Sequence, residues 1–129
     1  MQKTLFALAI LAATLPAQAD TITQWNFNSK PADTSTSTGS SLASIGSGTA
    51  LALGTVASFA SGSANGGSSD PVTTDDTGWG TTGYAAQGMG NKTRGVEFKV
   101  STLGMQDIVI SYDLRHSNTA SRYEQVQYT

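Results

Sequence analysis

The side chains most able to do chemistry gather near the end of the sequence, in "DLRHSNTASRYEQ". They are Arg115, His116, Arg122 and Glu124. They could form a ligand-facing rim at the end of a β-hairpin. The simpler interpretation is an ordinary hairpin tip, in which Ser117–Asn118 form the turn and the charged groups are solvated. The sequence favours the simpler interpretation and leaves the binding rim open.

Catalytic arrangements find little support in these residue types. His116 is the single histidine and there is no cysteine, which excludes a zinc site of the His/Cys type within one chain. A Ser-His-Asp triad would need His116 as its base, yet no Gly-x-Ser-x-Gly motif marks a nucleophile. Glycoside hydrolysis would need two carboxylates facing one cleft. The nearest pair, Asp113 and Glu124, should lie on opposite faces of the expected hairpin, so we predict that the chain is not an enzyme.

A cation site is the next alternative. Asp70, Asp75 and Asp76 lie in one predicted loop, and calcium prefers several oxygen ligands. No D-x-[DN]-x-[DN]-G pattern accompanies them. We therefore favour solvated loop acids, leave calcium binding open and predict no other cofactor.

Aromatic side chains could stack on sugar rings, although in a small β-domain they more often fill the core. We assign Trp25 and Phe27 to the core. The outer face of the expected hairpin combines polar side chains with one aromatic ring, as a sugar-binding surface does and as an ordinary solvated face also does. The candidate ligand-binding residues are Trp79, Tyr84, Asp113, Arg115, Tyr123 and Gln125.

The first residues, "MQKTLFALAILAATLPAQA", have the order of a secretory signal peptide. A single cation, Lys3, precedes the apolar run Leu5–Leu15, and Ala17–Ala19 supplies a small-x-small cleavage site. The apolar run is shorter than the roughly 20 residues that cross a bilayer. We expect cleavage after Ala19, a secreted or cell-surface protein, and no transmembrane span in the mature segment.

The composition limits what the mature segment, Asp20–Thr129, can do. Its length allows one domain. The whole chain has a net charge of -2 and no run of Lys or Arg, which argues against nucleic-acid binding. Without cysteines, a secreted domain must be held together by burial, by metal or by partners.

Alternation of side chains predicts strands throughout the segment. The early ones are Thr21–Asn28, Thr49–Leu53 and Thr55–Phe59. The polar loop Ser29–Ser41 follows the first of them. The glycine-rich residues 77–95 should form an irregular loop, held at the edge of the core by Trp79 and Tyr84.

The pattern is clearest near the end. In "GVEFKVST", Val96, Phe98 and Val100 share one face of a half-buried strand. In "DIVISYDLR", the inward residues are Ile108, Ile110, Tyr112 and Leu114.

The predicted strand over residues 107–115 could form a hairpin with a last strand over residues 121–129. Pairing Arg115 with Arg122 would place like charges opposite each other, whereas pairing Arg115 with Ser121 avoids this. We prefer the second register, with a turn at His116–Ala120. Alternatively, the two strands belong to different sheets, as in a Greek key.

Together these elements predict an all-β fold, an antiparallel β-sandwich. Six candidate strands are fewer than a closed sandwich usually has, and the last stops at Thr129 without a turn. We expect the sandwich to be incomplete, with its closing strands beyond Thr129.

Three stretches carry a family resemblance: "TITQWNFN", "GWGTTGYAAQGMGNKTRGVEFKVSTLG" and "DIVISYDLRHSNTASRYEQVQYT". They resemble a LamG-like jelly-roll module of secreted bacterial proteins. Similar modules occur in proteins with a C-terminal PEP-CTERM sorting tail, and ahead of extracellular endonuclease/exonuclease/phosphatase domains. The 129 residues contain no such tail or enzyme domain, and the resemblance supplies no catalytic residues.

The resemblance implies a non-catalytic module that binds polysaccharide or extracellular matrix, or that has a structural role at the cell surface. The alternative is an N-terminal accessory module of a larger secreted enzyme.

Overall fold

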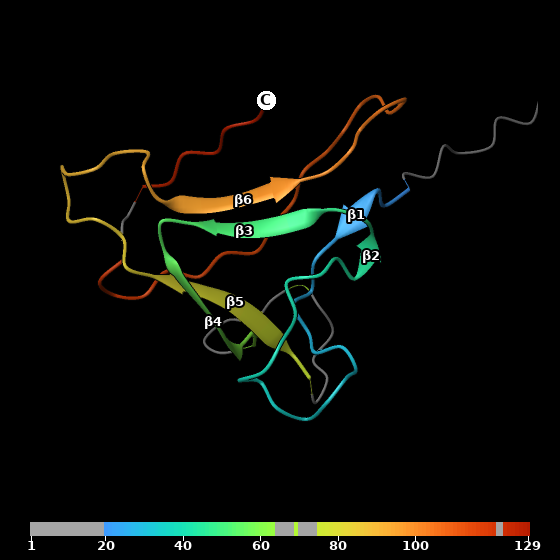
Figure 1. Cartoon of the computed structure of the whole chain (residues 1–129), viewed down its shortest axis with the longest axis horizontal. Helices are drawn as coiled ribbons and strands as arrows, with labels where there is room; N and C mark the ends of the chain where they lie inside the picture. Colours follow the sequence, from blue (N-terminus) through green and yellow to red (C-terminus); the bar gives the residue numbers. More distant parts are fainter. Residues whose placement is uncertain (1–19, 64–68, 70–74, 121–122) are drawn as a thin grey trace, which may run out of the picture.

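The computed structural model describes residues 20–63, 69, 75–120 and 123–129, and this part of the chain is all β (Figure 1). It has six short strands and no helix within the described residues: β1 (Thr23–Gln24), β2 (Ile45–Gly46), β3 (Thr49–Leu53), β4 (Val56–Ser61), β5 (Thr77–Thr82) and β6 (Gly95–Lys99). The predicted all-β class is confirmed. The predicted signal peptide (1–19), Asp70 and Arg122 lie outside the described residues. In the part that is described, no helix has the length and hydropathy to cross a membrane.

The strands form three antiparallel pairs, β1–β2, β3–β6 and β4–β5. Although β3 and β4 follow each other in the chain, they belong to different pairs. Gly54 lies between them with φ at +62°, in the left-handed region that glycine adopts without strain. The register places Ala50 opposite Phe98 and Phe59 opposite Trp79.

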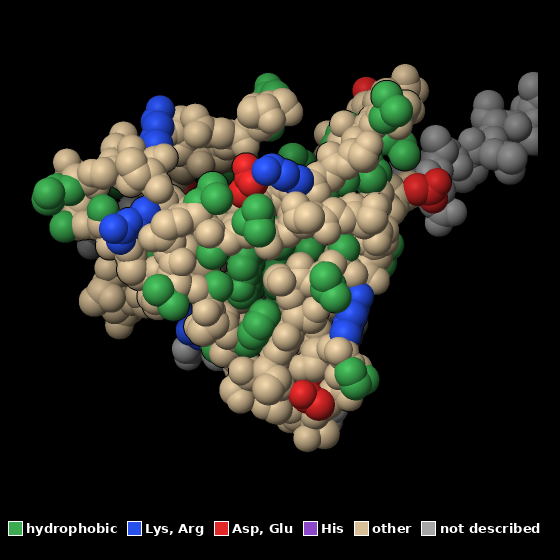
Figure 2. Space-filling view, viewed as in Figure 1, with side chains coloured by type: hydrophobic (Ala, Val, Ile, Leu, Met, Phe, Trp, Pro, Cys, Tyr) green, Lys and Arg blue, Asp and Glu red, His purple; other side chains and the backbone are tan. Residues whose placement is uncertain are grey.

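Four aromatic rings join the two longer strand pairs. Trp79 of β5 meets the edge of Phe98 of β6, with ring centroids 6.2 Å apart. Phe27 stacks on Trp79 at 5.4 Å, and Trp25 packs against Phe98 at 5.0 Å. Figure 2 shows hydrophobic side chains gathered in the hollow between β3 and the β4–β5 pair. Trp25 and Phe27, which the sequence predicts to be core residues, lie in this aromatic cluster and are half-buried.

The aromatic cluster is only partly covered. Among the described residues no hydrophobic side chain is fully buried, and Phe98 is still 45% exposed. The buried residues of this part of the chain are polar: Asp75, Asp76 and Thr77. A fold with this distribution has little hydrophobic stabilisation to spare.

The carboxylate of Asp75 holds the loop that follows β1 against the start of β5. It accepts hydrogen bonds from the backbone N–H groups of Ser29 (3.2 Å) and Asp33 (3.1 Å), and from the hydroxyl of Thr77 (3.4 Å). The Thr77 N–H in turn donates to the side-chain oxygen of Asn28 at 2.9 Å. The prediction of solvated loop acids is wrong for Asp75 and Asp76, which are 5% and 3% exposed. The oxygens of Asp75 meet backbone donors in place of water, whereas Asp76 Oδ2 is buried without a hydrogen-bond partner.

The first predicted strand, Thr21–Asn28, is shortened to the two residues of β1. Phe27 has a positive φ of 60°, which ends the extended conformation that a ladder needs. Residues 24–27 still bond to the segment before β2, without the regular spacing of a ladder. The Ser44 N–H donates to the Gln24 carbonyl at 2.7 Å, and the Ser40 N–H donates to the Phe27 carbonyl at 3.1 Å.

The irregular loop predicted for residues 77–95 is wrong in its first six residues, which form β5. The sequence of β5 is Thr-Gly-Trp-Gly-Thr-Thr. Glycine occupies positions 78 and 80, where a typical half-buried strand would have polar side chains that alternate with apolar ones. Gly78 lies opposite Ala60, and Gly80 lies opposite Ser58. This small-residue face has no hydrophobic pattern, which is why the alternation was not recognised.

The predicted strand over residues 107–115 and its hairpin with 123–129 do not form within the described residues. The chain does turn, since the Ala120 N–H donates to the Ser117 carbonyl at 3.1 Å. No ladder joins residues 107–115 to residues 123–129, so the preferred register is not observed among the described residues. The predicted inward residues are not covered; Ile110 and Leu114 are 70% and 53% exposed, and a ladder gains little without a layer beneath it.

Replacing Gly48 tests the packing of Trp25. A Cβ at position 48 would lie 2.9 Å from the indole ring and 2.6 Å from the Lys99 carbonyl oxygen, so Gly48→Ala should lower the free energy of unfolding by about 1–3 kcal/mol. Gly95→Ala is the matched control, because nothing lies within 4 Å of its Cβ. Urea denaturation of residues 20–129 measures both, and equal stability of the two variants would contradict this packing.

Asp75 allows a second test of the fold. Asp75→Ala removes the acceptor for two backbone N–H groups, so the free energy of unfolding should fall by about 1–3 kcal/mol for each donor left without a partner. The control is Asp76→Asn, since Asp76 Oδ2 is buried without a hydrogen-bond partner and its replacement breaks no bond at that atom. A larger loss in the control than in Asp75→Ala, measured by thermal unfolding, would refute the role of Asp75.

Candidate functional site

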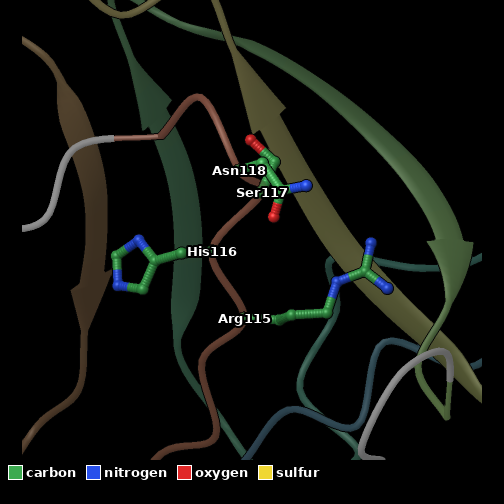
Figure 3. A pocket seen from close by; sticks show the side chains of 4 residues that line it. All are labelled: Arg115, His116, Ser117 and Asn118. Atoms are coloured by element: carbon green, nitrogen blue, oxygen red, sulfur yellow. The ribbon is translucent and has the colours of Figure 1, made fainter.

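A polar hollow of about 450 Å³ lies beside the turn that follows residues 107–115 (Figure 3). Its lining is Arg115, His116, Ser117 and Asn118. These four side chains supply a guanidinium, an imidazole, a hydroxyl and an amide. The hollow therefore offers hydrogen-bond donors and acceptors of several geometries within a short stretch of chain.

Two of these side chains leave the backbone on opposite sides. Figure 3 shows the imidazole of His116 on one side of the chain and the guanidinium of Arg115 on the other. Neighbouring residues of an extended chain point in opposite directions, so this follows from local geometry. The arrangement suits contacts spread along a ligand better than it suits two groups acting on one atom.

His116 has a carboxylate partner. Its Nε2 lies 3.6 Å from Oε1 of Glu124, and both side chains are about 40% exposed (42% and 39%). An exposed pair of this kind contributes about 0–1 kcal/mol to stability. The contact places a carboxylate beside the imidazole at the rim of the hollow, and both groups stay in water.

Asp113 connects this segment to the loop between β4 and β5. Its Oδ2 accepts hydrogen bonds from the hydroxyl and from the backbone N–H of Ser69, the latter at 2.7 Å. The Ser69 hydroxyl, followed by its N–H, lowers the pKa of Asp113 below the ordinary value of 3.8. The carboxylate thus acts as a structural acceptor and is already engaged.

The other candidate residues lie in different surroundings. Trp79 is half-buried in the aromatic cluster. Tyr84 is 52% exposed, and its hydroxyl lies 2.7 Å from that of Thr81. Tyr123 is 86% exposed, and Gln125 is also exposed.

Of the six predicted ligand-binding residues, the described lining of the hollow includes only Arg115. The sequence grouped Arg115 with His116, and the structure keeps them together. For Ser117 and Asn118 the sequence predicts only a turn, and the structure adds them to the lining of the hollow. One signal could have identified Ser117 and Asn118 as lining residues. Their hydroxyl and amide directly follow Arg115 and His116 in the sequence.

Metal binding receives no geometric support from the described residues. No group of three or more His, Cys, Asp and Glu residues among them could hold a metal ion. Asp75 uses its oxygens for Ser29, Asp33 and Thr77. Asp76 is 3% exposed and has one oxygen without a hydrogen-bond partner, but no second carboxylate of the described part joins it to form such a group.

Comparison of the chain with protein-family models, with curated proteins and with solved structures found no match.

The Ser69–Asp113 contact gives a prediction in the acid range. Because folding favours the ionised carboxylate, the stabilisation that it contributes is present above pH 3.8 and is lost as the pH falls through the lowered pKa. In Ser69→Ala the carboxyl pKa should move back toward 3.8, with Ser117→Ala as the unaffected control. A carboxyl-carbon NMR titration checks this, and a wild-type pKa of 3.8 or above would show that the contact is absent.

Proposed function

We propose that this chain is a secreted β-sandwich module, of the LamG-like jelly-roll kind, that binds polysaccharide without catalysing a reaction. The observation that carries the proposal is the polar hollow lined by Arg115, His116, Ser117 and Asn118 on an all-β scaffold. Export is supported by the signal-peptide pattern of residues 1–19.

The sandwich part of the proposal is supported by the way in which the strand pairs meet. Rings from β5 and β6 contact each other across the space between the β4–β5 pair and the β3–β6 pair. Two antiparallel layers that share one apolar interior are the defining feature of a sandwich. Phe59 of β4 lies opposite Trp79 and extends the same inner face.

The polysaccharide part is supported by the polarity of the hollow, whose described lining is Arg115, His116, Ser117 and Asn118. Sugar hydroxyls both donate and accept hydrogen bonds, and the lining provides charged donors together with a hydroxyl and an amide. Tyr123 and Tyr84 are exposed aromatic rings on the same chain, and such rings can stack on sugar faces.

The test is affinity electrophoresis of residues 20–129 against a panel of neutral and acidic polysaccharides. At least one polysaccharide should retard the wild-type protein. Asn118→Ala removes an amide of the hollow and should weaken binding about tenfold, the effect expected for a hydrogen bond worth about 1.4 kcal/mol. Tyr123→Ala should weaken it if its ring stacks on the same ligand.

The matched control is Met89→Ala, because Met89 is 70% exposed and is absent from the described lining of the hollow. It should bind as the wild type does. Two results would count against the proposal: no retardation by any polysaccharide, or equal retardation of Asn118→Ala and the wild type.

A further inference from the structure

We propose that residues 107–115 pair antiparallel with the same segment of a second copy, forming a sheet across a two-fold axis at Ser111. The argument for this pairing does not rest on polysaccharide binding, although Arg115 belongs both to the lining of the hollow and to the paired segment. It is carried by the backbone of residues 107–114, which has no backbone–backbone hydrogen bond among the described residues, and by the order of side chains along "DIVISYDLR".

The backbone edge is unpaired in the described structure. No backbone–backbone hydrogen bond among the described residues involves residues 107–114, and every residue of 107–115 is exposed. Val109 and Ile110 are 88% and 70% exposed. An extended, apolar segment with free N–H and C=O groups is a template for pairing with another chain.

The segment is complementary to itself when it is reversed. An antiparallel pair centred on Ser111 places Ile108 opposite Leu114 and Ile110 opposite Tyr112, so apolar side chains meet on one face. At the ends, each Asp107 meets the Arg115 of the other copy, and the two-fold axis produces this ion pair twice.

Neighbouring registers are less favourable. An axis at Ile110 would place Asp107 opposite Asp113, and like charges facing each other destabilise a sheet. A shift of the pairing by a single residue would set Ile108 against Asp113 and break the match between apolar residues. The axis at Ser111 is the one that joins Asp107 to Arg115 at both ends and keeps Ile108, Ile110, Tyr112 and Leu114 together, while Val109 lies opposite Asp113 on the other face. This self-complementarity is why we take a second copy as the partner.

The conformation of the segment fits a ladder of this length. Asp107 has a positive φ of 53°, so regular pairing would cover residues 108–114, with Asp107 and Arg115 at its two ends. Ile108 and Ile110 also line an apolar hollow of about 400 Å³ together with Tyr128. Pairing of two copies would bring two such hollows onto one continuous face.

Sedimentation equilibrium of residues 20–129 in low salt tests the proposal by charge reversal. The wild type should form dimers. Asp107→Arg and Arg115→Glu each place like charges at both ends of the pairing, so each variant alone should show a dissociation constant raised about tenfold or more. An equimolar mixture of the two variants restores opposite charges at both ends and should dimerise as the wild type does.

A monomeric wild type would overturn the proposal, and so would a mixture that remains as weakly associated as its components. Higher assemblies that are insensitive to these charges would mean unspecific aggregation and would overturn it as well. Recovery in the mixture also shows that both variants are folded, because two misfolded chains would not regain specific pairing.

A single cysteine gives an independent measurement, since the chain has none of its own. Residues directly opposite across antiparallel strands have Cβ atoms about 4.5–5.5 Å apart, close to the distance that a disulfide bridges. Ser111→Cys should form a disulfide-linked dimer on mild oxidation, whereas Met89→Cys, also exposed, should not. Equal cross-linking of the two variants would contradict an axis at Ser111.

Discussion

The edge contact between the rings of Trp79 and Phe98 joins the β4–β5 pair to the β3–β6 pair. Phe27 and Trp25 pack on its two ends. Each strand pair alone has too little apolar surface to be stable in water. The four rings provide the shared interior, and glycine at position 48 leaves the space that the Trp25 indole occupies.

The polar contacts around Asp75 complement this interior. They connect the loop after β1 to the start of β5, and Asn28 and Thr38 both bond to Thr77 in the same region. Trp79 follows Thr77 by two residues on the same strand face, so the polar contacts fix the part of β5 from which the aromatic ring projects. The described fold is thus held by a small aromatic centre and by buried hydrogen bonds beside it.

The sequence predicted the parts of this fold that alternate in hydrophobicity. β3 has the bounds that were predicted, and Phe98 lies on the inner face as its neighbours indicated. β5 was missed because glycines hide its alternation. The burial of Asp75 could not be predicted from the sequence. Its backbone N–H donors, Asp33 and Ser29, lie 42 and 46 residues earlier in the chain, and a local sequence pattern contains no information on such contacts.

The candidate site shows the same division between local and distant information. Arg115 and His116 were recognised as a polar group from their types and spacing, and they line the hollow. The opposite directions of their side chains follow from the extended backbone. The bond from Ser69 to Asp113 spans 44 residues and had no signal in the sequence. The predicted hairpin failed for another reason: alternation indicates an inner face but not what covers it.

The most direct test of the fold on which these proposals stand is a solution NMR measurement on residues 20–129. If the aromatic cluster joins the strand pairs, nuclear Overhauser effects should connect the Trp79 indole protons with the ring protons of Phe98 and Phe27. Both tryptophan side chains should also show chemical shifts displaced by neighbouring rings. Tryptophan resonances at random-coil positions, with no contacts to Phe98, would contradict the account.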